Sequence, residues 1–160
     1  MLDVSGGSRR EIVCPAVPDD ERLWVPSAPG VAFTPLFFDT VNGGWADVGR
    51  ARTTGVISRH HHPAPVHAYV IKGSLRYQEH GWVASAGSYM FEPPGDTHTL
   101  IVDEGVDEMI TFFYTVGCLI YVDDDGRPTG YDDVHTRIAS CRAHFEAVGL
   151  GSDFIERYIR

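Results

Sequence analysis

The sequence predicts an all-β fold, a sandwich or barrel of short antiparallel strands, with α-helices added at the C-terminal end. Between residue 23 and about residue 122, short apolar runs rich in β-branched and aromatic side chains alternate with turns signalled by Gly, Pro or Asp. Beyond residue 130, the apolar residues recur instead at steps of three and four, which is typical of a helix. The chain has 160 residues, of which 43% are hydrophobic, enough to form one domain with a real core.

The chain divides into three predicted regions. Residues 1–20 are small, polar and interrupted by proline, so we expect a flexible arm. Residues 21–125 carry the strand pattern and should form the barrel, with "NGG" at 42–44 as a hairpin turn. Residues 126–160 should form helices packed on the barrel.

The predicted helix has a single apolar stripe, and its members are Val134, Ile138, Cys141, Phe145 and Val148. Asp132 or Asp133 can cap its start, and Gly149 can end it in a left-handed turn. A short final helix should then follow, with Ser152 as its cap.

Charge and composition exclude several classes of partner. The net charge is −9 and no basic cluster is longer than "SRR", which argues against nucleic acid and against an anionic membrane surface. No window of 18 apolar residues predicts a transmembrane helix, and the N-terminus lacks the apolar core of a signal peptide. The three cysteines are odd in number and lack metal-motif spacing, so we expect a reduced, cytoplasmic protein.

Histidines are concentrated in "SRHHHPAPVHAYVIKG", residues 58–73. His60 and His62 are two residues apart, and side chains at that spacing in a strand point to the same side, whereas His61 should point away. A second ordered segment, "GSYMFEPPGDTHTLIV" at 87–102, places His98 at the start of a strand after a turn. These three histidines, His60, His62 and His98, are therefore a candidate metal-ligand set.

This pair of segments resembles the two motifs of the cupin superfamily, over about residues 40–120. The matching positions are Gly55, His60, His62 and Gly73 in the first motif, and Gly87, Pro93, Gly95 and His98 in the second. The resemblance implies a jelly-roll type β-sandwich or barrel. The sequence departs from it where the final Asn is replaced by Val102 and where the glutamate position falls at Val66 or His67. Either the site uses three histidines, or His67 supplies a fourth nitrogen; we place His67 near the site but outside the ligand set.

Over most of its length the chain also resembles the 2,4'-dihydroxyacetophenone dioxygenase family of small cupins. The resemblance rests on "HPAPVHAYVIKG", "FEPPGDTHTL" and the tail that begins "YVDDDGRPTGYDDV". It implies a non-haem Fe(II) enzyme of aromatic catabolism. Such enzymes use O2 to cleave the bond between the carbonyl and hydroxymethyl carbons of an aryl hydroxyketone, giving an aromatic acid and formate. The iron would be held by His60, His62 and His98.

Histidine ligands are compatible with the proposed oxygen chemistry, but they do not determine which metal is bound. Imidazole binds Fe, Zn, Cu and Ni, so Zn, Ni or Mn are alternatives to Fe(II) in the isolated protein. Three protein ligands leave coordination positions for substrate and O2. Because neutral ligands do not compensate the 2+ charge, we expect a substrate that chelates as an anion, such as the enolate or alkoxide of a 2-hydroxyketone.

An apolar, aromatic interior should bind the aryl group and exclude water. The candidate near-site residues are His67, Tyr69, Tyr77, Trp82, Tyr89, Met90 and Phe112. A proton acceptor for the substrate hydroxyl is also needed, and Glu79 and Glu92 are the nearby carboxylates. Glu92 is preferred because it lies just before the turn that delivers His98.

Other functions compete with this one. A cupin dioxygenase could act on another carbonyl substrate such as a β-diketone, a cupin isomerase could use Zn or Mn, and a cupin could bind a metal or a small molecule without catalysis. We expect a small aromatic or carbonyl substrate and O2 as partners. We also expect a homodimer or homotetramer, by analogy and because apolar helix faces need cover.

Overall fold

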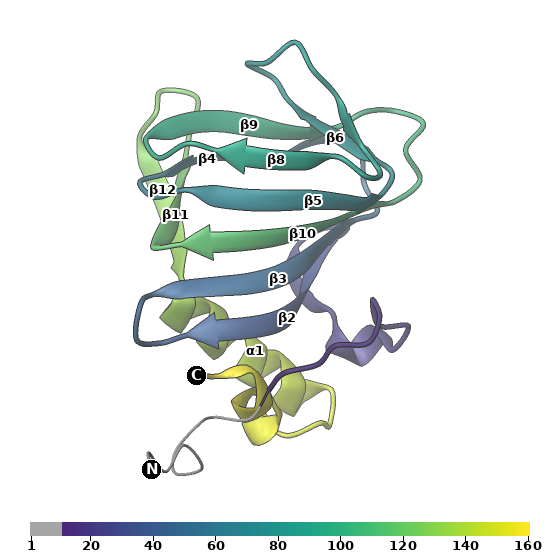
Figure 1. Ribbon diagram of the computed structural model, residues 1–160, viewed down its shortest axis with the longest axis vertical. Coiled ribbons are helices and arrows are strands. Elements are labelled where there is room, and N and C mark those ends of the chain that lie inside the picture. The colour runs from purple at the N-terminus through teal and green to yellow at the C-terminus, as the bar shows by residue number, and fades with distance from the viewer. Residues whose placement is uncertain (1–10) are drawn as a thin grey trace, which may run out of the picture.

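Two six-stranded antiparallel sheets face each other in the computed structural model, which describes residues 11–160 (Figure 1). The first sheet has the order β1-β2-β3-β10-β5-β8, and the second has the order β12-β11-β4-β9-β6-β7. The predicted all-β sandwich with a C-terminal helix is thereby confirmed.

The strands of the first sheet are β1 (Val25–Ala28), β2 (Val31–Asp39), β3 (Gly44–Ala51), β10 (Met109–Val116), β5 (Val66–Lys72) and β8 (Tyr89–Glu92). The strands of the second sheet are β12 (Pro128–Asp133), β11 (Cys118–Val122), β4 (Gly55–His62), β9 (Asp96–Val102), β6 (Ser74–Tyr77) and β7 (Ala84–Ser85). The helical elements are η1 (Glu21–Leu23), α1 (Val134–Ala147) and η2 (Ser152–Tyr158), where η denotes a 3₁₀-helix.

Helix α1 closes one end of the sandwich, beneath β2 in Figure 1. The Asp133 side chain caps it by accepting hydrogen bonds from the backbone N–H groups of His135 and Thr136. Its buried face consists of Val134, Ile138, Cys141 and Phe145. Because this stripe packs against β1, β2 and β12, α1 can send side chains into the space between the sheets.

The C-terminal region differs from the prediction in two details. Strand β12 lies in the region expected to be helical, because Pro128–Asp133 pairs with β11 across a short hairpin. The last helix is a 3₁₀-helix preceded by Gly151, so Ser152 is not its cap. Half of the predicted N-terminal arm, residues 1–10, lies outside the described residues.

Gly73 makes the turn from β5 to β6 at a point where no other residue fits. Its φ is +69°, and a Cβ added there would lie 2.4 Å from the carbonyl oxygen of Glu108. Glycine adopts this left-handed conformation without a steric penalty. The second glycine of the first motif is therefore needed for the local packing.

The core has two main parts. One cluster lies between the sheets, and its members include Leu75, Tyr77, Met90, Leu100 and Met109. The other joins α1 to the sandwich through Phe38, Trp45, Phe145 and Ile155. Within residues 11–160, no helix is long and apolar enough to cross a bilayer.

Candidate metal centre

The three histidines singled out in the sequence lie together between the sheets. Strands β4 and β9 pair so that His60 lies directly opposite His98, and their Nε2 atoms are 3.2 Å apart. The His62 ring centroid lies 5.0 Å from that of His98. His61 points the other way, and its Nδ1 lies 3.0 Å from Thr97 Oγ1. The alternation along β4 thus separates the converging pair from the histidine between them.

A carboxylate joins the histidines. Glu92 Oε2 lies 3.3 Å from His62 Nε2 and 3.4 Å from His98 Nε2. Glu92 comes from β8, where it is the cross-strand partner of Val66 on β5. All four side chains are buried, with His62 fully excluded from solvent. Four potential ligand side chains from three strands therefore lie together, and those of His60, Glu92 and His98 bring their ligand atoms within 4.8 Å of one another.

His60 and His62 are each held through the other ring nitrogen, whereas Nδ1 of His98 is buried without a hydrogen-bond partner. Nδ1 of His60 lies 3.1 Å from Ser58 Oγ, and Nδ1 of His62 lies 3.0 Å from the Ala64 carbonyl oxygen. Nδ1 of His98 is 3.4 Å from Asp96 Oδ2. A carbonyl oxygen only accepts, so neutral His62 carries its proton on Nδ1 and its lone pair on Nε2. Such outer contacts orient metal-ligating imidazoles in proteins.

The donor set fits a metal ion. Two ligands about 2.1 Å from one metal, at angles of about 90–110°, lie roughly 3.0–3.4 Å apart. The distances among His60, His98 and Glu92 fall in this range at 3.2 and 3.4 Å. In addition, Nε2 of His62 is buried and has no partner in hydrogen-bond geometry. A buried donor without a partner is costly, and a cation would satisfy it. This buried His–His–Glu group, with His62 beside it, could therefore hold a metal.

Burial and mutual contacts set the charges of the group. Burial, together with the neighbouring His98, lowers the pKa of His60 to about 3. Burial opposes ionisation of Glu92, but His62, His98 and Tyr77 outweigh it and lower the pKa of this carboxyl to about 2. Burial also disfavours the cationic form of His62, yet the Glu92 carboxylate and the Ala64 carbonyl raise its pKa. At neutral pH the site thus presents a neutral His60 and an ionised Glu92.

Tyr77 supports both the imidazole and the carboxylate. Its ring stacks on the His98 ring with centroids 3.7 Å apart, and its hydroxyl donates a hydrogen bond to Glu92 Oε1. Burial and the adjacent Glu92 raise the pKa of Tyr77 well above its usual value, so the hydroxyl stays protonated. Trp82 packs edge-on against Tyr77 at 5.5 Å, and Met90 is buried in the core between the sheets.

Four other predicted near-site residues do not reach the site. They lie on the outer face of the first sheet, and they are His67, Tyr69, Tyr89 and Phe112. The reason is the strand phase: Val66 points inward, so its neighbour His67 points outward, and its Nδ1 lies 2.8 Å from the Tyr89 hydroxyl. The structure therefore does not bring His67 to the histidine cluster.

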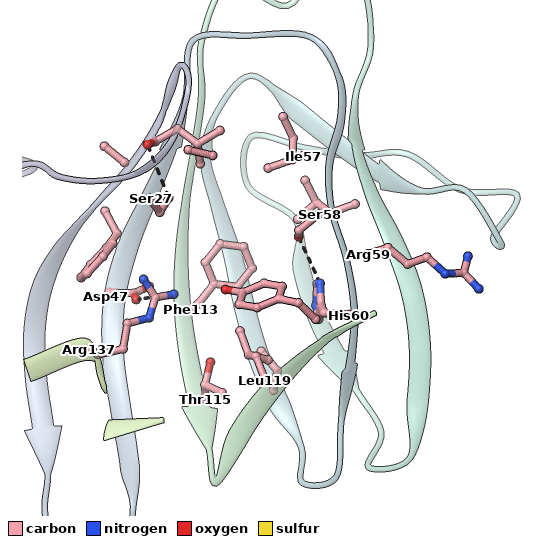
Figure 2. A pocket seen from close by; sticks show the side chains of 18 of the residues that line it. Ser27, Asp47, Ile57, Ser58, Arg59, His60, Phe113, Thr115, Leu119 and Arg137 are labelled. Atoms are coloured by element: carbon pink, nitrogen blue, oxygen red, sulfur yellow. Dashed lines mark hydrogen bonds and ion pairs between the residues drawn. The ribbon is translucent and has the colours of Figure 1, made fainter. Parts of the chain in front are cut away.

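A cavity of about 460 Å³ opens from the histidine cluster into the sandwich (Figure 2). Its near end is lined by His60, Glu92 and Tyr77. Apolar side chains line its middle, and they include Val66, Leu100, Met109, Phe113 and Leu119. Its far end carries Asp47 and Arg137, which belong to no sequence motif described above. The cavity therefore has a polar group at each end of an apolar passage.

The two-sheet sandwich and the clustered histidines define a cupin. More particularly, the chain belongs to the family described as the ChrR cupin-like domain, whose model matches residues 15–119. A comparison with curated proteins found no match.

Several solved structures share the fold. An RmlC-like cupin protein from Ralstonia eutropha JMP134 is 29% identical, with a TM-score of 0.77 over 87% of this chain and 91% of the other. A cupin-like protein of unknown function from the same organism is 25% identical, with a TM-score of 0.72 over 75% of each chain. An acetylacetone dioxygenase from Acinetobacter johnsonii is 18% identical, with a TM-score of 0.70 over 86% of this chain and 97% of the other. At that identity, the last similarity shows the fold alone.

Proposed function

We propose that this protein is an Fe(II)-dependent dioxygenase that cleaves a C–C bond of a small aryl 2-hydroxyketone. The balanced reaction is ArC(O)CH2OH + O2 → ArCOOH + HCOOH, in which the bond between the two side-chain carbons breaks and each carbon gains one oxygen atom. The observation that carries the proposal is the buried cluster of His60, His98 and Glu92, with His62 beside it, at one end of a largely apolar cavity.

His60, His62 and His98 would hold the metal through Nε2. When bound, Fe(II) would supply a chelation site for the two substrate oxygens and the electrons that activate O2. His60 faces the cavity, whereas His62 and His98 are buried behind it, so substrate would approach from the His60 side. His67 is not assigned as a metal ligand, because its side chain lies on the opposite face of the strand.

Glu92 is the proposed acceptor of the substrate's hydroxyl proton. It lines the cavity next to the histidines and is ionised, as a base must be. The hydrogen bond from Tyr77 holds this carboxylate in one orientation. Glu79, the other candidate from the sequence, accepts hydrogen bonds from Thr99 and contacts Arg59, so it is engaged outside the cavity.

The cavity suits a flat aryl group. Its volume of about 460 Å³ lies within the usual range for small-molecule sites. The apolar walls around Phe113 and Leu119 would exclude water from the reacting oxygen.

Oxygen uptake by iron-loaded protein tests the proposal. Metal-free protein is loaded anaerobically with Fe(II) and mixed with aryl 2-hydroxyketones or β-diketones in air-saturated buffer. We expect O2 consumption and formate release in a 1:1 ratio with the hydroxyketones. His62→Ala should abolish both, whereas His61→Ala, with its side chain on the opposite face, should retain them. O2 uptake with β-diketones alone would show that the substrate is a β-diketone and not an aryl 2-hydroxyketone. Iron binding without any O2 uptake would indicate a non-catalytic metal-binding cupin.

A further inference from the structure

The far end of the cavity holds a buried cation. Helix α1 projects Arg137 between the sheets, where its side chain is only 12% exposed. The guanidinium lies 4.1 Å from the centroid of the Phe33 ring and 5.7 Å from that of Trp45. Figure 2 shows Arg137 beside Asp47, across the cavity from His60. A charged group in this position is costly unless something accepts its hydrogen bonds.

The protein satisfies this guanidinium only in part. Two carboxylates approach it, with Nε at 3.4 Å from Asp132 Oδ2 and one terminal nitrogen at 3.7 Å from Asp47 Oδ2. Both separations exceed the usual length of an N–H···O hydrogen bond. Nε is buried and has no hydrogen-bond partner. Since a guanidinium carries five N–H donors, this end of the cavity offers donors to an acceptor on a bound molecule.

The surrounding carboxylates limit which acceptor fits. Asp47 accepts a hydrogen bond from Trp45 Nε1 at 3.2 Å, and Asp132 accepts one from the Tyr121 hydroxyl at 2.7 Å. Burial raises the pKa of Asp47, but as long as either carboxyl group is ionised the local net charge is not positive. A ligand carboxylate would gain no net attraction here and would be repelled by Asp47 and Asp132. A hydroxyl can accept from Arg137 and donate to Asp47 at the same time.

The two ends of the cavity are separated by three strand spacings of the first sheet. Trp45, Thr115, Val66 and Glu92 form one row of cross-strand neighbours on the first sheet. Three strand spacings put the backbones at the two ends about 14 Å apart, and side chains reach inward from both. On the second sheet, the Tyr121 ring lies 6.5 Å from that of His60, and its hydroxyl reaches Asp132 beside Arg137.

We propose that Arg137 and Asp47 form a specificity site for a neutral hydroxyl group at the end of the ligand remote from the histidine cluster, as in a para-hydroxyaryl ketone. The orientation of the ligand, with its ketone toward His60, rests on the proposed function. Arg137 acts as a positioning and specificity residue and takes no part in the bond cleavage.

Binding without turnover tests the site. Protein loaded with redox-inactive Zn(II), and metal-free protein in parallel, is titrated calorimetrically with 2-hydroxy-1-phenylethanone and its para-hydroxy and para-carboxylate analogues. We expect the para-hydroxy probe to bind about 10-fold more tightly than the unsubstituted one, and the para-carboxylate probe about 10-fold more weakly. Equal binding of the hydroxylated and unsubstituted probes would overturn the assignment.

Substitutions test whether Arg137 and Asp47 cause the preference for the para-hydroxyl group. Arg137→Lys keeps the charge but loses the planar fork, and should reduce the hydroxyl preference to about 2-fold or less. Asp47→Asn keeps the shape and removes a charge, and should improve binding of the para-carboxylate probe about 10-fold. Arg142→Lys, on the exposed side of the same helix, is the matched control and should leave all three affinities unchanged. Unchanged preferences in folded Arg137→Lys and Asp47→Asn would contradict the inference.

The two proposals fail separately. A hydroxyl preference in a protein that consumes no O2 would refute the dioxygenase function and retain the Arg137 site. Oxygen-dependent cleavage with no preference for the para-hydroxyl would retain the function and refute the site.

Discussion

Glu92 on β8 lies directly opposite Val66 on β5. The cupin resemblance places the glutamate of the first motif at Val66 or His67, neither of which is acidic, and the carboxylate of this site comes from the neighbouring strand instead. Directly opposed side chains in an antiparallel pair have Cβ atoms about 4.5–5.5 Å apart, close enough for a glutamate on either strand to reach the same point. The histidine cluster is therefore accompanied by a carboxylate that motif spacing alone does not reveal.

Replacing Glu92 tests its proposed role. Glu92→Gln keeps the shape but removes the base, so we expect turnover of the iron-loaded enzyme to fall by about 10²-fold. Iron affinity should fall by about 10-fold or more if the carboxylate supports the metal. Steady-state O2 uptake and Fe(II) titration measure the two effects. Glu79→Gln, which removes the other nearby carboxylate, should change turnover less than about 3-fold. A larger loss of turnover in Glu79→Gln than in Glu92→Gln would identify Glu79, and not Glu92, as the proton acceptor.

Tyr77→Phe removes the hydroxyl donor to Glu92 and keeps the ring stacked on His98. Because a carboxylate that loses a hydrogen-bond donor is less stabilised in its ionised form, the pKa of Glu92 should rise. The acid limb of the pH–rate profile should then move to higher pH, with a smaller loss of turnover at pH 8 than in Glu92→Gln. Tyr69→Phe, on the exposed outer face, is the control. An unshifted acid limb would show that Tyr77 does not tune this carboxyl.

The stability of metal-free protein should fall as the pH is lowered. His60 binds a proton below about pH 3 when folded but near its ordinary pKa of 6.5 when unfolded. The unfolded chain therefore binds more protons between pH 6.5 and 3, and stability is lost as the pH falls through this window. The depressed pKa of Glu92 adds a loss in the same direction below about pH 4.5, whereas the raised pKa of His62 acts in the opposite direction.

Urea unfolding of EDTA-treated protein at pH 7 and pH 5 measures this dependence. The free energy of unfolding should be lower at pH 5, and His60→Asn should flatten the difference. Higher stability at pH 5 than at pH 7 would mean that the raised pKa of His62 dominates.

Gly73→Ala should destabilise the fold more than other substitutions at left-handed glycines. The added Cβ would collide with the Glu108 carbonyl, in addition to the cost of φ +69°. Gly105 has φ +88° with open space around it, so Gly105→Ala carries only the conformational cost. The difference in unfolding free energy should exceed about 1 kcal/mol, measured in parallel urea titrations. Equal losses would show that the turn relaxes around the new side chain.

Local sequence patterns predicted the features that depend on neighbouring residues. The spacing of His60 and His62 gave their common direction because alternation along a strand is a local property. The stripe from Val134 to Phe145 and the cap at Asp133 likewise depend on residues within one helix.

Long-range pairing explains the rest. The position of Glu92 opposite Val66 depends on the register between β5 and β8, and no local pattern fixes this register. Arg137 adjoins the apolar stripe of α1, and only the packing of that helix over the end of the sandwich turns it toward Asp47, ninety positions earlier in the chain. The outward direction of His67 depends on β5 keeping its alternation after Pro63 and Pro65.

A crystal structure of the Fe(II)-loaded protein, with anomalous data collected at the iron edge, would show whether the histidine cluster binds the metal. We expect one anomalous peak per chain within about 2.3 Å of Nε2 of His60, His62 and His98, with the cavity side of the ion open to ligands. A peak elsewhere, or no iron between three imidazoles that have moved apart, would contradict this expectation.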